Sequence, residues 1–373
     1  MLKTLLRWVL RGGLGLVALV ALLVMTRWIL QERIRVAQAI QSPPGIDSME
    51  EVEVGNIKQW IHIRGRDRRN PILLYLHGGP GTPMMPFAYK FQSYLEGAFT
   101  VVEWDQRGSG KTYFANDPAQ VTPTINYERM QTDALDMVNL LRNRFQQQKI
   151  FLIGHSWGSM LGLPLVHAHP ELFYAYVGTG QVINARQNER LGYEHTLAEA
   201  KSRGDADAVK ALSAIDPYPD PVTGIVGNKM DVIRHWEFRY GFALYGKTDL
   251  YREMLKFAIV SPDYSLHDFY YFVADPGHEV LDKWIDGFDA KALGDDFQVP
   301  IVFIFGHNDW QVPGVIAEEY LKGISAPAKG FYWVEKASHS PMVEQPQEFA
   351  QIMIDHVRPF APAASTGEPA PAN

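Results

Sequence analysis

The amino-acid sequence predicts an α/β fold with three parts: an eight-stranded, mostly parallel sheet, a helical cap inserted after the sixth strand, and an N-terminal transmembrane helix. Short β-type runs alternate with helical patterns along the chain, as in parallel sheets joined by right-handed crossovers. The alternation stops between residues 182 and 290, which are rich in aromatic and charged residues and have helical patterns. Residues 12–26 carry no charge, as a membrane-spanning segment requires.

The first element is an apolar segment from Trp8 to Leu30. Its 23 positions are long enough to span a bilayer if Arg11 and Arg27 reach the two surfaces. Trp8 and Trp28 stand where aromatic residues gather at membrane interfaces. We therefore assign residues 1–40 to a single-pass membrane anchor and its stalk.

A cleaved signal peptide is the alternative for this segment, because Ala37-Gln38-Ala39 has the small residues that a signal peptidase requires. The charged stretch 31–36, between the apolar core and that sequence, disfavours cleavage. Positive charge is only slightly greater before the span than after it. This balance favours a cytoplasmic N-terminus and a catalytic body outside the cytoplasm.

Composition excludes several classes of protein. The chain has no cysteine, which excludes disulfides, thiolate metal sites and thiol nucleophiles. Residues 1–40 hold six basic residues against one acidic residue, so the rest of the chain carries about −12 of a total net charge of −7. A body this acidic has no basic surface for nucleic acid, and we expect no nucleic-acid partner.

Eight runs have the composition of β-strands. The first two, 50–54 and 58–64, alternate apolar and polar residues, as exposed or edge strands do. The other six are continuous apolar runs, typical of buried parallel strands, at 71–76, 99–104, 149–154, 174–178, 299–305 and 330–335. Apolar positions at three- and four-residue spacing predict a helix at 126–145.

These runs divide the chain. The core of the fold is predicted in two parts, 41–181 and 291–360, interrupted by the helical cap at 182–290. Helical patterns within the cap cover 189–204, 230–246 and 265–288. Residues 361–373 are rich in proline and alanine, and we expect a disordered tail.

The most informative motif is Gly154-His155-Ser156-Trp157-Gly158, which follows an apolar strand and opens a helical segment. This is the pattern of a nucleophile elbow, a turn so tight that the residues two before and two after the serine must be small. Ser156 would stand exposed at the end of its strand, and the N–H of Trp157 would point toward a developing oxyanion. An ordinary tight turn is the alternative.

A serine nucleophile needs a base and an acid that orients it. Asp309 comes just after the strand 299–305 and His339 just after the final strand, and ligands bind at these carboxyl ends in open α/β sheets. Serine, aspartate and histidine follow one another along the chain in the order found in hydrolases whose nucleophile lies in such an elbow. Glu335 is the alternative acid, and His307 is an alternative histidine.

The loop His77-Gly78-Gly79-Pro80-Gly81 predicts a second oxyanion donor, since glycines let the backbone approach a substrate oxygen. The N–H of Gly79 is the first choice and that of Gly78 the alternate. The bond before Pro80 is a candidate for the cis form. A plain Gly/Pro turn is the alternative.

His167 and His169 have a spacing that some metal sites use, but they stand at the end of a predicted helix. A histidine satisfied at a helix end is the simpler interpretation. We predict no metal and no cofactor.

Five motifs, HGGPG, WDQRGSGKT, GHSWGS, GHNDWQVP and ASHSP, make residues 50–360 similar to the proline iminopeptidases of the α/β-hydrolase superfamily. Members of that family release an N-terminal proline from peptides. The resemblance implies an α/β-hydrolase fold and assigns the same site residues: Ser156 as nucleophile, His339 as base, Asp309 as its partner, and main-chain donors near Gly79 and at Trp157.

That family holds the substrate's ammonium group with glutamates of the cap, one of them in a Trp-x-x-Trp-Glu-like helix. Trp236-Glu237 matches this motif only partly, and the family's second cap motif is not found, which leaves proline specificity open. Glu194 and Glu189 are further candidates for the ammonium acceptor. A solvated helix face is the alternative for each.

We predict a membrane-anchored serine hydrolase acting on a small-molecule or short-peptide substrate, most like a proline iminopeptidase. A carboxylesterase or amidase acting on partly apolar acyl compounds is the second hypothesis. A non-catalytic binding module is the third, which the intact Ser–Asp–His set disfavours. Within WDQRGSGKT, we expect Asp105, Arg107 and Ser109 to be scaffold rather than catalytic.

Overall fold

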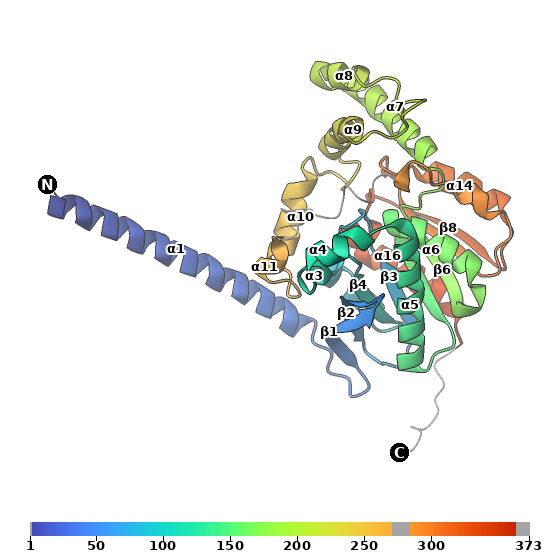
Figure 1. Cartoon of the computed structure of the whole chain (residues 1–373), viewed down its shortest axis with the longest axis horizontal. Helices are drawn as coiled ribbons and strands as arrows, with labels where there is room; N and C mark the ends of the chain where they lie inside the picture. Colours follow the sequence, from blue (N-terminus) through green and yellow to red (C-terminus); the bar gives the residue numbers. More distant parts are fainter. Residues whose placement is uncertain (1, 271–283, 363–373) are drawn as a thin grey trace.

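The computed structural model describes residues 2–270 and 284–362 and contains an eight-stranded sheet (Figure 1). The strands follow one another in the sheet in the order β1-β2-β4-β3-β5-β6-β7-β8. Pairs β1–β2 and β2–β4 are antiparallel, and all other pairs are parallel. The strands are β1 (Ile46–Val54), β2 (Ile57–Gly65), β3 (Ile72–Leu76), β4 (Thr100–Asp105), β5 (Ile150–His155), β6 (Phe173–Thr179), β7 (Ile301–Gly306) and β8 (Lys329–Val334). The predicted mostly parallel α/β sheet is confirmed.

Strand composition follows position in the sheet. Every residue of β3, β4, β5 and β7 is buried, because these central strands are covered on both faces. β1 alternates between exposed and covered positions at the sheet edge. β2 has the same alternating sequence, but it lies between β1 and β4, and its Ile61 and Ile63 are fully buried.

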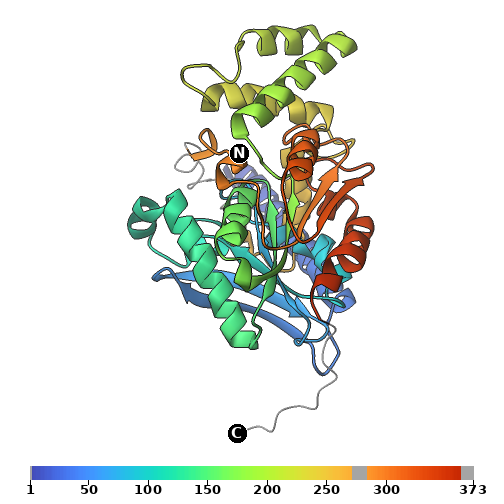
Figure 2. The ribbon, with the colours of Figure 1, turned by 90° about the vertical axis from the view of Figure 1, so that its right-hand side faces the viewer.

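Helices cover the two faces of the sheet. Figure 2 shows α5 (Tyr127–Phe145) and α16 (Pro346–Ile352) on opposite sides, and α6 (Trp157–Ala168) packs on the side of α5. The predicted helix 126–145 agrees with α5, which begins where the Asn126 side chain accepts from the N–H of Arg129. The short helical elements of the core are η1 (Met85–Lys90), α2 (Gln92–Leu95), α3 (Gly110–Phe114), α4 (Pro118–Val121), η2 (Thr122–Thr124), η3 (Pro170–Leu172), α14 (Gly314–Gly323), α15 (Pro341–Glu344), η5 (Met353–Val357) and η6 (Arg358–Phe360).

The described part of the segment between β6 and β7 contains helices joined by turns and no strand of the sheet, and much of it lies over one end of the strands (Figure 2). Its helices are α7 (Ala185–Arg203), α8 (Ala206–Ser213), α9 (Gly227–Tyr240), α10 (Leu250–Ile259), α11 (Leu266–Phe269) and η4 (Ala290–Leu293). Tyr193, Leu212 and Ile233 form a hydrophobic core of its own. A bridge between Asn184 and Asp289 joins its two ends.

Two predicted stretches differ from the structure or fall outside it. The helix predicted at 230–246 ends at Tyr240, because Gly241 takes a left-handed conformation and turns the chain. The helix predicted at 265–288 lies largely outside the described residues, apart from α11. The predicted tail also lies outside them after Pro362.

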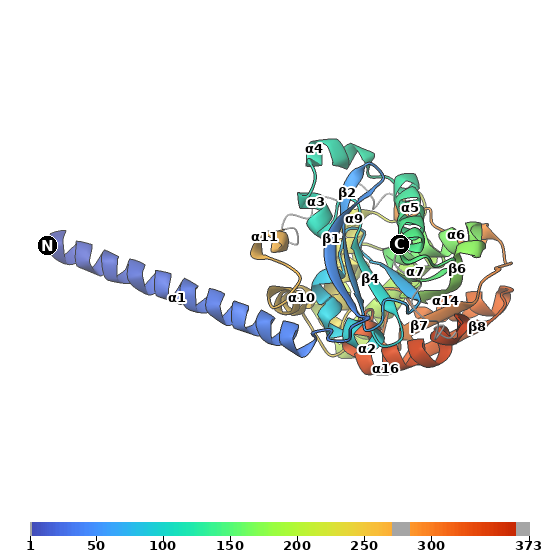
Figure 3. The ribbon, with the colours of Figure 1, turned by 90° about the horizontal axis from the view of Figure 1, so that it is seen from below.

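Helix α1 (Leu2–Ala37) leaves the body as a long rod (Figures 1 and 3). Between Trp8 and Ala37 it is long and apolar enough to cross a membrane, and its most apolar stretch is not buried against the body. This finding agrees with a membrane anchor, and a signal sequence near the N-terminus would meet the same criterion.

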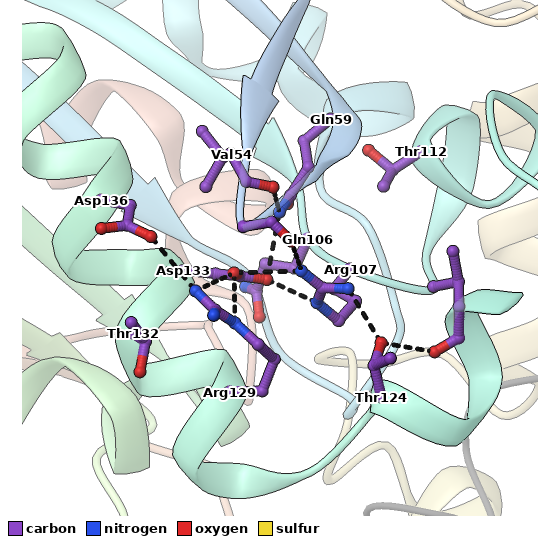
Figure 4. A network of polar contacts seen from close by, with 12 residues as sticks. Val54, Gln59, Gln106, Arg107, Thr112, Thr124, Arg129, Thr132, Asp133 and Asp136 are labelled. Atoms are coloured by element: carbon purple, nitrogen blue, oxygen red, sulfur yellow. Dashed lines mark hydrogen bonds and ion pairs between the residues drawn. The ribbon is translucent and has the colours of Figure 1, made fainter.

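A buried ion pair connects the loop after β4 to α5. Asp133 accepts from Arg107 Nε at 2.7 Å and from Arg129 Nε at 2.8 Å, and Gln59 Nε2 donates to it at 3.1 Å (Figure 4). Asp133 is fully buried and Arg107 nearly so. Arg107 is thus structural, as the sequence analysis expects for this motif, and it fixes the loop that follows β4.

Replacing Asp133 with alanine is expected to lower the free energy of unfolding by about 3–5 kcal/mol, because it leaves the buried guanidinium of Arg107 without its counter-charge. Asp136→Ala is the matched control on the same helix. Asp136 is solvent-exposed and, among the described residues, binds only Arg129, so its loss should cost less than about 1 kcal/mol. Urea unfolding in detergent, followed by tryptophan fluorescence, measures both. Equal losses would contradict the burial argument.

Candidate active site

The turn between β5 and α6 has the backbone of a nucleophile elbow. Ser156 has φ 53° and ψ −121°, a conformation that a non-glycine residue rarely adopts. A Cβ atom at Gly154 would lie 2.7 Å from the carbonyl oxygen of Gly158, and one at Gly158 would lie 2.1 Å from that of Leu76. Side chains at 154 and 158 would therefore prevent the turn, which explains the two glycines that flank the serine.

Asp309 and His339 meet beyond the ends of β7 and β8. Asp309 Oδ2 lies 2.9 Å from His339 Nδ1, and Asp309 Oδ1 accepts from the N–H of Val312 at 2.9 Å. Asp309 is 4% exposed, so the contact is shielded from water. A carboxylate at Nδ1 holds the proton there, which leaves Nε2 as the nitrogen that can accept a proton.

The alternative acid and histidine lie elsewhere. Glu335 and His307 form an exposed pair, with His307 Nδ1 3.1 Å from Glu335 Oε1. Their side chains are 70% and 61% exposed. The geometry therefore favours Asp309 over Glu335 as the partner of His339.

The chain after β6 brings the serine turn and the histidine together. Ser156 N–H donates to the carbonyl oxygen of Thr179 at 3.0 Å. The next residue, Gly180, faces the histidine pair: a Cβ atom there would lie 2.9 Å from His339 Cε1 and 3.6 Å from Asp309 Oδ2. Ser156, Asp309 and His339 thus gather around residues 179–180.

His155 contributes a contact that the sequence analysis missed. Its Nε2 donates to the carbonyl oxygen of His339 at 2.8 Å, and the two rings lie 4.9 Å apart. Burial and the neighbouring His339 lower the pKa of His155 to about 3, so it remains a neutral donor. His155 positions the main chain of His339, and only its place next to Ser156 in the motif could have signalled this.

Glu344 holds the loop that carries His339. Its carboxylate accepts from the N–H groups of Tyr245, Ser338 and Ser340. Burial raises the pKa of Glu344 to about 7, although these hydrogen bonds oppose the shift. Because Tyr245 belongs to the cap segment, Glu344 links the histidine loop to the cap. No motif in the sequence points to this role of Glu344.

The glycine loop lies directly against the serine. A Cβ atom at Gly78 would lie 3.0 Å from Ser156 Cβ. Gly79 has φ 110°, where a Cβ atom would lie 2.6 Å from the main-chain nitrogen of Gly81. The bond between Gly79 and Pro80 is cis, as anticipated. Trp157 is the first residue of α6, so its N–H has no acceptor within the helix.

His77 couples this loop to the WDQRGSGKT motif. Its Nδ1 donates to the carbonyl oxygen of Gly78 at 3.0 Å, and its Nε2 accepts from the N–H of Gln106 at 3.1 Å. Gln106 Nε2 donates back to the carbonyl oxygen of His77 at 3.2 Å. Burial lowers the pKa of His77 to about 4, so it stays neutral. These contacts give a physical reason why the two motifs occur together.

Asp105 and Ser109 of that motif are also buried and bonded within the scaffold. Ser109 Oγ donates to the carbonyl oxygen of Gln106 at 2.7 Å. Asp105 accepts from the N–H of Lys111 and from the hydroxyl of Tyr264 in the cap segment. Burial raises the pKa of Asp105 to about 7. Both residues stabilise the loop, in agreement with the sequence analysis.

Glu237 lies inside the cap with a carboxylate that is only partly satisfied. It is fully buried, and its Oε2 accepts from Arg234 Nη1 at 2.8 Å. Its Oε1 has no hydrogen-bond partner among the described residues. That oxygen would lie 3.1 Å from a Cβ atom at Gly192, which would also contact the carbonyl oxygen of Trp310, next to Asp309. Glu237 thus lies on the side of the cap that faces Trp310, the neighbour of Asp309 in the chain.

Arg234 connects Glu237 to Glu189. Arg234 Nη2 donates to Glu189, and the hydroxyl of Tyr218 donates to Glu189 at 2.7 Å. Burial and the repulsion from Glu189 raise the pKa of Glu237 to about 7, and Arg234 opposes that shift. Two buried carboxylates thus share one guanidinium.

Trp236 and Glu194 are not brought into this group. Trp236 packs against the cap's own core, 6.1 Å from the ring of Tyr240. The side chain of Glu194 is 59% exposed and lies 4.0 Å from Arg190 on the same helix. Neither contact points to a role at the site.

Comparisons with known proteins agree with this architecture. The family model described as alpha/beta hydrolase fold matches residues 71–215. The chain is 33% identical over 328 residues to the Probable aminopeptidase YbaC of Bacillus subtilis, covering 86% of this chain and 99% of that protein. It is 24% identical over 311 residues to a Proline iminopeptidase of Chitinophaga pinensis, covering 82% of this chain and 95% of that protein.

A solved structure gives the same fold. The crystal structure of proline iminopeptidase from Mycobacterium smegmatis superposes with a TM-score of 0.59 at 18% identity, covering 84% of this chain and 98% of that chain. This structural similarity supports the fold assignment and nothing more specific. The 33% identity to YbaC, over 99% of that protein, shows the family as well as the fold. Together with the sheet and the elbow, this identity places the chain in the α/β-hydrolase superfamily, in the branch of the proline iminopeptidase-like hydrolases.

Proposed function

We propose that the chain is a serine hydrolase that cleaves an amide or ester bond through Ser156, His339 and Asp309. Its activity would be of the aminopeptidase type, with release of an N-terminal residue from small peptides. Helix α1 would hold it in the membrane, with the catalytic body outside the cytoplasm. The observation that carries the proposal is the shielded 2.9 Å contact between Asp309 and His339 beside a serine in an elbow turn.

The proposed reaction runs through an acyl-enzyme. His339 Nε2 takes the proton of Ser156 as the serine oxygen attacks the substrate carbonyl carbon, and Asp309 stabilises the resulting imidazolium. The N–H groups of Gly79 and Trp157 hold the oxyanion, with Gly78 as the alternate donor. His339 then gives its proton to the leaving amine or alcohol. A water molecule, deprotonated by His339, releases the acyl group and restores Ser156.

The charge balance of the cap supports a substrate with a free amino group. Glu189 and Glu237 together carry two negative charges when ionised, and Arg234 supplies one positive charge. An ammonium group next to the free Oε1 of Glu237 would balance the cluster. The names of the relatives, aminopeptidase and proline iminopeptidase, favour the same class of substrate.

Glu237→Gln is expected to lower kcat/KM for proline naphthylamide by about 10- to 100-fold, the cost of losing a hydrogen bond to a charged group. Hydrolysis of a nitrophenyl ester, which has no ammonium group, should be nearly unchanged. Glu194→Gln on the exposed face of α7 is the matched control and should affect neither substrate. Equal losses on both substrates with Glu237→Gln would reject the ammonium-binding role.

The same pair of substrates gives a pH test. Because the pKa of Glu237 is raised to about 7, its charged form is lost as the pH falls through that value. The rate ratio of amide to ester should therefore fall from pH 8 to pH 6, since changes at His339 affect both substrates and cancel. In Glu237→Gln the ratio should be flat across this range.

An esterase or amidase that needs no amine is the second candidate. The hydrogen bond from Arg234 favours it, because Glu237 is already partly neutralised without a ligand. Ester activity that exceeds amide activity in the wild type and survives Glu237→Gln would support this candidate.

A fluorophosphonate probe separates both enzymes from a non-catalytic binding module. The wild type should be labelled at Ser156, and Ser156→Ala should not be. If neither protein is labelled, the hydrolase proposal fails.

A further inference from the structure

Helix α10 presents an apolar row to the outside of the protein. Its inner face packs on the core through Met254, Phe257 and Ala258. On the outer face, Tyr251, Leu255 and Ile259 follow one another at four-residue spacing and are 74%, 47% and 41% exposed. A surface helix of a globular protein normally has polar residues there, so an outward apolar row indicates a contact surface.

Basic residues lie along one side of this row. Arg252 and Lys256 are exposed and follow Tyr251 and Leu255 by one position each. Lys256 also pairs with Glu253 at 2.5 Å. An apolar row with basic residues beside it is the arrangement of helices that lie in the interface of a lipid bilayer.

The end of α10 is fixed to α1. Arg27 Nε donates to the carbonyl oxygen of Ile259 at 2.9 Å, and Arg35 Nη2 donates to that of Pro262 at 2.8 Å. Between them, Gln31 is nearly buried and donates to the carbonyl oxygen of Ser261. These side-chain contacts set the position of α1 relative to α10.

Helices α1 and α10 lie roughly across one another (Figures 1 and 3). In Figures 1 and 3, α10 lies on the side of the body from which α1 leaves, and it runs across the direction of α1. If the apolar segment from Trp8 to Leu30 crosses a bilayer, Arg27 reaches one of the two membrane surfaces. Ile259 contacts Arg27, so α10 would lie along that surface.

We propose that the outer face of α10, formed by Tyr251, Leu255 and Ile259 with Arg252 and Lys256, rests in the headgroup region of the bilayer that α1 spans. The proposal depends on the membrane anchoring by α1 described above. The protein would then contact the membrane in two ways: α1 spans the bilayer, and α10 lies in its interface. The part of the cap that carries α10 would then lie at the lipid surface.

The absence of cysteine from the chain allows single-cysteine labelling of the full-length protein. Leu255→Cys, labelled with a nitrobenzoxadiazole dye, tests α10. Val17→Cys tests the span, and Glu319→Cys is the control, because Glu319 is exposed on α14, on the side of the body opposite α1 (Figures 1 and 3). Each protein is placed in phosphatidylcholine–phosphatidylglycerol vesicles, with either lipids carrying a doxyl quencher below the headgroup or iodide in the water.

The doxyl lipids should quench the dye at 255 and at 17 several-fold more than the dye at 319, and iodide should quench most at 319. Strong quenching at 17 with a dye at 255 that behaves like the one at 319 would overturn the proposal for α10 alone. A dye at 255 protected from iodide but insensitive to doxyl lipids would also overturn it, in favour of a second protein copy. No lipid quenching at 17 would overturn the anchoring and the proposal together.

Discussion

Replacing Ser156 with alanine is expected to lower kcat for proline naphthylamide and for nitrophenyl esters by about 10⁶-fold, as loss of a triad nucleophile does in other serine hydrolases. The amide and the ester should be affected alike, because both would react through the same oxygen. A small rate above that of water should remain, since the oxyanion donors and the substrate contacts stay in place.

The variant should keep its fold. Alanine and serine have the same backbone requirement at φ 53°, and the N–H of residue 156 still donates to Thr179. Thermal unfolding within a few degrees of the wild type would show this. Ser202→Ala, at an exposed position of α7, is the control and should have wild-type kinetics. If Ser156→Ala kept more than about 1% of wild-type kcat, the nucleophile would be another residue.

The sheet and the elbow were predictable because both depend on residues that are close together in the sequence. A continuous apolar run such as 301–306 predicts a strand that is buried on both faces, whatever its neighbours are. The two glycines around Ser156 reflect a steric limit within one turn, because a Cβ atom at Gly154 would collide with Gly158 and one at Gly158 would collide with Leu76. Patterns of this kind depend on few residues.

The contacts that position the site were not predictable in the same way. Glu344 binds Tyr245, which is 99 positions away in the chain, and His155 binds a carbonyl oxygen 184 positions away. No periodicity or motif encodes the partner of such a side chain. The end of α9 at Tyr240 is a related case. The residues after it continue a helical sequence pattern, but they leave the helix and bind the loop that carries His339. The carbonyl oxygen of Ala243 accepts from the N–H of His339, and that of Gly241 accepts from Ser338 Oγ.

The cap shows the limit of assigning roles by motif. Trp236 and Glu237 are neighbours in one partial motif, yet Trp236 packs in the cap core while Glu237 turns its free oxygen toward Gly192. Adjacent residues on a helix point in directions about 100° apart, so a two-residue motif cannot bring both to one site. Burial, which the sequence does not give directly, separates Glu237 from the exposed Glu194.

Asp309→Asn is expected to lower kcat by about 10⁴-fold while keeping the shape of the site. The N–H of Val312 donates to Asp309 Oδ1, so the amide oxygen of an asparagine should take that position and the NH₂ group should face His339 Nδ1. Nδ1 must then accept a hydrogen bond, which moves the imidazole proton to Nε2. A protonated Nε2 cannot take the proton of Ser156.

This variant separates the two candidate acids. Glu335→Gln changes the same atoms on the exposed alternative and should alter kcat by less than about twofold, because a surface pair with His307 contributes little. Steady-state kinetics of both variants on one ester substrate, with the rate of fluorophosphonate labelling as a second measure, gives the comparison. A large loss with Glu335→Gln and a small one with Asp309→Asn would reverse the assignment, and it would require His339 to change its partner during the reaction.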